Sequence, residues 1–177
     1  MSGEPGNVAL VTGSGSGIGR AAALAFAERG VSVVIADIDP VGGEQTVVGV
    51  NERGGEGMFV HTDISQADEV DELLARTVDA FGGLDRAVNC AAIASELAAT
   101  ADCDESNWDR TIAVNLKGTW LCLRAEIKQM LASGGGSIVN TASVAGVVGV
   151  AGLPAYNAPK NLFQNRSWGR AGEHRQR

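Results

Sequence analysis

Two residues toward the C-terminal end of the sequence, Tyr156 and Lys160, are spaced so that they could move a proton to or from a substrate. Residues four positions apart share one face of a helix, so the phenol and the ammonium group would be neighbours. A nearby cation favours the phenolate and lowers the pKa of tyrosine from its usual ~10. Such a tyrosine can act as a general acid or base toward an alcohol or a ketone. Taken alone, a Tyr–Lys pair at this spacing is usually part of an exposed helix surface.

A second candidate site is the glycine-rich turn TGSGSGIG at residues 12–19. It follows an apolar run and opens a helical pattern. Glycines let the backbone approach a pyrophosphate, and a helix N-terminus presents free N–H groups and the positive end of its dipole. The alternative is a tight strand–helix turn with no ligand, but the strand before it and the helix after it match the requirements of a dinucleotide site.

An acidic residue, Asp37, ends the next apolar run, 18 residues beyond Gly19. A carboxylate at about 20 residues from the glycine turn can accept hydrogen bonds from the adenosine ribose hydroxyls of a dinucleotide. It would repel a 2′-phosphate, and neither Ser16 nor Ile38 offers a positive charge to such a group. The pattern therefore favours NAD over NADP. The alternative is a solvated acid in the turn before Pro40.

The elements that must position these residues alternate along the chain. Apolar runs without polar alternation predict buried strands, at residues 8–11, 33–36, 58–60, 84–88 and 137–139. Helical patterns separate them, at residues 18–29, 40–53, 70–81 and 108–130, the last with a stripe of Trp108, Ile112, Leu116 and Trp120. This order predicts an α/β fold with a Rossmann-like, doubly wound parallel sheet of five strands.

Composition narrows the class of protein. The chain has 177 residues, of which 24 are glycine, and a formal net charge of −7. The length suits one domain, and the negative charge argues against nucleic acid as a partner. Three cysteines without a CxxC pair predict neither a disulfide framework nor a metal site. We expect no signal peptide in residues 1–6, no membrane segment and a cytoplasmic location.

Further short motifs follow the glycine turn. They are, in chain order, Asp63-Ile64 after the third strand, Asn89-Cys90-Ala91-Ala92 after the fourth, Asn115 within VNLKG, and Ser143 thirteen residues before Tyr156. Together with the turn and the Tyr156–Lys160 pair, they resemble the motifs of the short-chain dehydrogenase/reductase family. The resemblance covers residues 7–160, which we interpret as part of an NAD-binding domain spanning residues 1–160.

The resemblance implies hydride transfer between NAD(H) and a secondary alcohol or its ketone, with Tyr156 as the general acid/base. Lys160 would bind the nicotinamide ribose and lower the tyrosine pKa, and Ser143 would hydrogen-bond the reacting oxygen. Asn115 would hold a water that connects Lys160 to solvent. The implied cofactor contacts are Gly13, Ser16, Gly17, Ile18, Gly19, Asp37, Asp63, Ile64, Asn89, Ala91, Tyr156 and Lys160.

Plainer structural interpretations stay open for several of these residues. Ser143 could cap the turn after the fifth strand, and Asn115 could be a polar residue on the open face of its helix. Cys90 is expected to be a small buried apolar residue rather than a nucleophile. In the family, the helices around Asn115 and after Lys160 form oligomer interfaces, so a homo-oligomer is implied if the full-length arrangement applies.

The sequence departs from the family pattern at and beyond Pro159. This proline would kink a helix that starts before Ala155. Residues 161–177 lack the apolar helix and the C-terminal strands of the family, and they carry four arginines and one glutamate. We interpret them as a non-matching basic tail, and we hypothesise an out-of-frame or alternative C-terminus. Two functions are therefore compatible with the sequence: an NAD-dependent alcohol dehydrogenase or ketoreductase, and a truncated, inactive NAD-binding remnant of such an enzyme.

Overall fold

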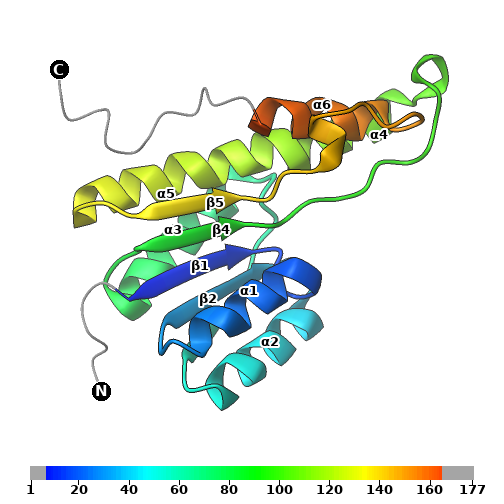
Figure 1. The fold of residues 1–177 in the computed structure, drawn as a ribbon. Helices are drawn as coiled ribbons and strands as arrows, with labels where there is room; N and C mark the ends of the chain where they lie inside the picture. The colour runs from blue at the N-terminus through cyan, green and yellow to red at the C-terminus, as the bar shows by residue number, and fades with distance from the viewer. Residues whose placement is uncertain (1–6, 165–177) are drawn as a thin grey trace.

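The computed structural model describes residues 7–164. Residues 1–6, on which the expectation about a signal peptide rests, lie outside the described residues. So does most of the basic tail, residues 165–177. The expected α/β fold is confirmed: five parallel strands form one sheet in the order β3-β2-β1-β4-β5 (Figure 1).

Strands and helices alternate along the chain as the apolar runs predict. The strands are β1 (Val8–Thr12), β2 (Ser32–Asp37), β3 (Glu56–His61), β4 (Arg86–Asn89) and β5 (Ser137–Asn140). The helices are α1 (Gly17–Ala27), α2 (Pro40–Glu52), α3 (Ala67–Phe81), α4 (Glu105–Ile112), α5 (Thr119–Ser133) and α6 (Pro154–Gln164). Three short turns of helix add η1 (Thr100–Asp102), η2 (Ala113–Gly118) and η3 (Val144–Gly146).

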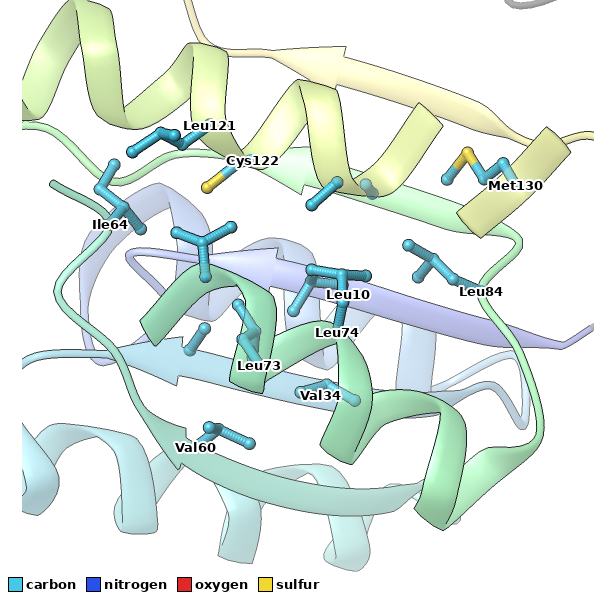
Figure 2. Packing of buried hydrophobic residues seen from close by; sticks show 14 residues of the cluster. Leu10, Val34, Val60, Ile64, Leu73, Leu74, Leu84, Leu121, Cys122 and Met130 are labelled. Carbon is cyan, nitrogen blue, oxygen red and sulfur yellow. The ribbon is translucent and has the colours of Figure 1, made fainter. Parts of the chain in front are cut away.

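Helices cover both faces of the sheet, with α1 and α2 on one side and α3 and α5 on the other (Figure 1). Successive residues of a strand point to opposite faces, so β1 contributes to two cores. Leu10 packs with residues of α3 and α5, including Leu73 and Met130 (Figure 2). Ala9 and Val11 pack in the second cluster, under α1 and α2. Burying β1 on both faces fixes the carboxyl end of the strand that leads into the glycine turn.

The edge strands differ from the expectation of strands buried on both faces. All five residues of β1 are buried, whereas β5 alternates between exposed and half-buried residues and β3 contains one buried residue. The reason is position in the sheet: among the described residues, β5 pairs with β4 alone and β3 with β2 alone. Val139 in β5 is 59% exposed.

The long helix expected over residues 108–130 is interrupted. It consists of α4, the π-helical segment η2 and α5. The stripe expected to include Trp108 and Trp120 does not face the core, because these side chains are 40% and 41% exposed. Asn107, Thr111 and Asn115 are buried instead. The wider π turn changes the helical register, which is a common feature near functional sites.

Candidate active site

The glycine turn joins β1 to α1 and is built by close contacts between backbones. Gly13 has φ +66, and a Cβ there would lie 2.6 Å from the Cα of Ala91, in the segment after β4. A Cβ on Gly19 would collide with the Gly13 carbonyl. Helix α1 begins at Gly17, and its N-cap residue, Ser16, makes no side-chain capping bond. The first N–H groups of α1 are therefore available to an anion.

The carboxylate of Asp37 lies at the end of β2, next to this turn. Its Oδ2 accepts a hydrogen bond from the Gly15 N–H at 2.7 Å, and its Oδ1 accepts one from the Asp39 N–H at 2.9 Å. Asp37 is half-buried and lines the adjacent cavity. It therefore holds the turn in place while one side of the carboxylate faces the cavity.

Arg20 is a cation near the turn that the sequence reasoning missed. Its Nη2 donates to the Gly15 carbonyl, and its Nε donates to the Thr46 hydroxyl on α2 at 3.0 Å. These bonds tie α1 to α2 and place the guanidinium behind the turn. The signal available in the sequence was an arginine directly after the last glycine of the motif.

A cavity of about 750 Å³ lies along the carboxyl ends of the strands, where doubly wound sheets bind their ligands. Nine of the twelve expected cofactor residues line it: Gly13, Ser16, Gly17, Ile18, Gly19, Asp37, Asp63, Ile64 and Ala91. The other three, Asn89, Tyr156 and Lys160, do not. Residues not singled out beforehand also line it, among them Thr62, Ile93, Arg110, Val114 and Thr141.

These features fit a dinucleotide. The positive φ of Gly13, the absence of any atom within 4 Å of a Cβ placed on Gly17, and the open N-terminus of α1 together form a cradle for a pyrophosphate. The cavity continues from this cradle past Asp37 on one side and past Ala91 to Thr141 on the other. The residues present could therefore hold a nicotinamide dinucleotide along the strand ends.

Cys90 differs from its expected role as a small buried apolar residue. It is half-exposed and lines the cavity, and its Sγ lies 3.0 Å from the Thr141 hydroxyl in a hydrogen bond. The physical reason is that Cys90 follows the last residue of β4, where the chain leaves the sheet and faces the cavity. Its thiol thus connects the ends of β4 and β5.

Asn115 does not lie on the open face of its helix, as one interpretation held, since it is 1% exposed. Its Oδ1 accepts from the Ile93 N–H at 2.8 Å, and its Nδ2 donates to the Ile93 carbonyl at 2.9 Å. Asn107, on the preceding α4, binds the backbone of Glu96 in the same way. Its Oδ1 accepts from the Glu96 N–H at 3.1 Å, and its Nδ2 donates to the Glu96 carbonyl at 3.4 Å. Two asparagines eight residues apart therefore fix the segment after β4 that walls the cavity. The role of Asn107 was missed because only the fold brings its partner near.

Tyr156 and Lys160 lie on one side of α6, with Lys160 Nζ 5.7 Å from the centre of the tyrosine ring. The lysine is 5% exposed, and its Nζ donates to the Thr141 carbonyl at 3.0 Å. Burial lowers the pKa of Lys160, and the interaction with Cys90 acts in the opposite direction. The ammonium group is thereby fixed against a residue that lines the cavity.

Pro159 lies inside α6, between the two residues of this pair. Because proline has no N–H, it cannot donate the helical bond to the Ala155 carbonyl. Ser143 caps η3 through a bond of 3.2 Å from the Ala145 N–H to its Oγ, as the structural interpretation expected. Since α6 packs against η3, the elements that carry Ser143 and Tyr156 are neighbours.

The comparisons with known proteins agree with this geometry. The sequence profile of the family described as short chain dehydrogenase matches residues 7–173. The chain therefore belongs to the short-chain dehydrogenase family, whose members are oxidoreductases that bind a nicotinamide cofactor. The match continues beyond Lys160, and the domain boundary placed there stays a prediction.

The chain is similar to several characterised relatives. It is 43% identical over 151 residues to a 2,5-dichloro-2,5-cyclohexadiene-1,4-diol dehydrogenase from Sphingobium indicum, covering 85% of this chain and 59% of that protein. It is 37% identical over 154 residues to a cyclohexanol dehydrogenase from Acinetobacter sp. strain SE19, covering 87% and 61%. The structure of NAD+-bound xylitol dehydrogenase superimposes with a TM-score of 0.87 and 33% identity, covering 89% and 61%. The chain thus spans about three-fifths of the length of these relatives.

None of the helices within residues 7–164 is long and apolar enough to cross a membrane. The same residues contain no group of three or more His, Cys, Asp or Glu side chains placed to bind a metal ion.

Proposed function

We propose that this chain is the cofactor-binding and catalytic part of an NAD-dependent dehydrogenase that interconverts a secondary alcohol and its ketone. The observation that carries the proposal is the Tyr156–Lys160 pair on α6, whose lysine is bonded to Thr141 in the cavity wall. A proton-transfer group is thereby attached to a site that fits a dinucleotide.

When bound, the nicotinamide group supplies the acceptor or donor of a hydride. The chain's own residues handle the proton and the orientation. Tyr156 takes the hydroxyl proton of the alcohol or returns it to the ketone oxygen. Lys160 is fixed by Thr141 beside the tyrosine ring, where it would bind the nicotinamide ribose. Ser143 hydrogen-bonds the substrate oxygen, and Asn115 orients the segment that carries Ile93.

The preference for NAD rests on Asp37. Its carboxylate lines the cavity beside the glycine turn, where it would meet the adenosine ribose. It would accept hydrogen bonds from the ribose hydroxyls and repel a 2′-phosphate. Arg20 does not offset this, because it lies against Gly15 and Thr46 and does not line the cavity. The solved xylitol dehydrogenase with bound NAD+ supports the same cofactor.

For the substrate, we propose a secondary alcohol carried on a carbon ring. Two relatives at 37% and 43% identity are named for cyclohexanol and for a chlorinated cyclohexadiene diol. The apolar stretch after Ser143 exposes Val144 and Val147 near α6 and could contact such a ring. Cytoplasmic location and assembly into a homo-oligomer stay predictions from the sequence.

A second candidate is a protein that binds NAD without turnover. The observation that favours it is that the 750 Å³ cavity lies over the glycine turn and is not lined by Tyr156, Lys160 or Ser143. Such a protein would need only the residues that form the pyrophosphate cradle and the rest of the cavity, because it transfers no proton.

The two functions are separated by assaying the purified chain. We expect NADH formation from cyclohexanol and related ring alcohols, and a much weaker response with NADP. Tyr156→Phe should abolish turnover and change the Kd for NADH little, because it removes the proton-transferring hydroxyl and leaves the cradle for the pyrophosphate intact. Saturable NADH binding with no turnover on any ring alcohol or ketone would favour the second function, and absence of binding would contradict both.

A further inference from the structure

A buried acid on α5, Glu126, takes no part in the mechanism described above. Its side chain is 0% exposed, and its Oε2 accepts a hydrogen bond from Asn89 Nδ2 at 2.9 Å. Its other oxygen, Oε1, is buried and has no hydrogen-bond partner among the described residues. Burial raises the pKa of Glu126 to about 7, and the bond from Asn89 opposes this rise. An unpaired buried carboxylate is costly, so the site needs a reason to retain an acid.

The partner of Glu126 belongs to a row of polar side chains across the sheet. Thr12, Asn89 and Asn140 are register partners at the carboxyl ends of β1, β4 and β5. Asn89 Nδ2 also donates to Asn140 Oδ1 at 3.0 Å, and Asn89 Oδ1 accepts from the Thr12 hydroxyl at 3.3 Å. The row is therefore continuous from one strand to the next, and Glu126 is bonded to its middle member.

The row reaches the cofactor site through Thr12. The Thr12 hydroxyl accepts a hydrogen bond from the Ala91 N–H at 3.4 Å. Ala91 lines the cavity and is the residue against which Gly13 packs with no room for a Cβ. A small displacement of Ala91 would therefore change the shape of the pyrophosphate cradle.

We propose that Glu126 is a positioning residue for cofactor binding, acting through Asn89 and Thr12 on the backbone at Ala91. The proposal rests on the proposed binding of NAD. The neutral acid accepts from Asn89 on Oε2 and carries its proton on Oε1, so the row keeps its geometry without a buried charge.

The surroundings of the carboxyl provide no compensating cation among the described residues. The neighbouring strands present the amides of Asn89 and Asn140, and α5 presents the thiol of Cys122, which stays neutral because burial raises its pKa. The buried residues of α3, which packs against α5, are uncharged: Val70, Leu73, Leu74 and Thr77. An ionised Glu126 would keep the bond from Asn89 but would add an uncompensated negative charge near the strand ends, which would repel the pyrophosphate and weaken NADH binding as pH rises.

The test is fluorescence titration of the whole purified chain with NADH between pH 5.5 and 8.5. If NADH binds the neutral form alone, the wild-type Kd rises about tenfold between pH 6 and 8. Glu126→Gln cannot ionise and keeps an acceptor for Asn89, so its Kd should stay near the low-pH value of the wild type. Glu72→Gln, an exposed change on α3, is the matched control and should keep the wild-type profile.

A second measurement needs no variant. Because linkage is reciprocal, NADH binding must raise the pKa of Glu126, which is visible in the ¹³C signal of its side-chain carboxyl. An unchanged Glu126 titration, or equal pH profiles for the wild type and Glu126→Gln, would overturn the proposal and leave NAD binding intact. A wild-type chain that binds no NADH at any pH would overturn the proposed function as well.

Discussion

At the scale of single residues, the site depends most directly on Gly13. An alanine there would place its Cβ 2.6 Å from Ala91 at a φ of +66, so it combines backbone strain with overlap. We expect Gly13→Ala to lower the free energy of unfolding by about 2 kcal/mol or more and to abolish NADH binding. Urea unfolding and fluorescence titration measure the two effects.

The control for this prediction is Gly54→Ala, in the turn between α2 and β3. Gly54 also has a positive φ, +83, but a Cβ there would meet nothing within 4 Å. Gly54→Ala should therefore lower the free energy of unfolding only by the cost of a left-handed backbone, about 1 kcal/mol, and leave NADH binding unchanged. Equal losses for the two variants would show that the close approach of Gly13 to Ala91 contributes nothing.

The residues predicted from the sequence are those carried by a local pattern. The glycine turn and Asp37 could be predicted because they follow two apolar runs at the spacing of a strand, a turn, a helix and the next strand. Glu126 and Asn107 could not, because their partners Asn89 and Glu96 are 37 and 11 residues away and reach them only through the fold. A buried glutamate also has no local signature, since a helix can place it on either face.

At the scale of elements, the apolar runs located all five strands, and the differences lie in burial and register. Sequence alone could not show that β5 is an edge, because strand order depends on pairing between distant segments. It also could not show the π turn η2, which interrupts the helix between α4 and α5 and is accompanied by an exposed Trp108 and a buried Asn107. Apolar periodicity assumes a constant helical repeat, and that assumption fails at this turn.

Helix α2 offers a test of how the turn after Asp37 is held. Asp39 is its N-cap, and Asp39 Oδ1 accepts from the Val41 N–H at 3.0 Å. Asp39→Ala should lower the free energy of unfolding by about 1 kcal/mol, because it leaves a helix N–H without its partner. Urea unfolding at constant pH measures the loss.

The matched control is Asp104→Ala at the N-cap of α4, where the side chain makes no capping hydrogen bond. Asp104 interacts with the helix dipole alone, so its removal should cost roughly 0.3–0.5 kcal/mol. If Asp104→Ala cost as much as Asp39→Ala, the hydrogen bond to Val41 would not be the source of the stability.

At the scale of the whole molecule, the two faces of the sheet are covered unevenly. Ile138 of β5 packs into the core under α5, whereas Val139 points to the opposite face and is 59% exposed. Helices α1 and α2 cover β1, β2 and β3 on that face and leave the end of the sheet at β5 uncovered (Figure 1). Within the described residues, β5 therefore combines an unpaired edge with an exposed apolar side chain.

Such an edge promotes pairing between copies of a chain. We expect the purified chain to self-associate with rising concentration and Val139→Lys to reduce this association, because a charge on an edge strand opposes strand pairing. Sedimentation velocity over a range of concentrations measures it. Val41→Lys is the matched control, since Val41 is 66% exposed but lies on helix α2, which has no open hydrogen-bonding edge. Equal reduction by both variants would assign the association to net charge rather than to the edge of β5.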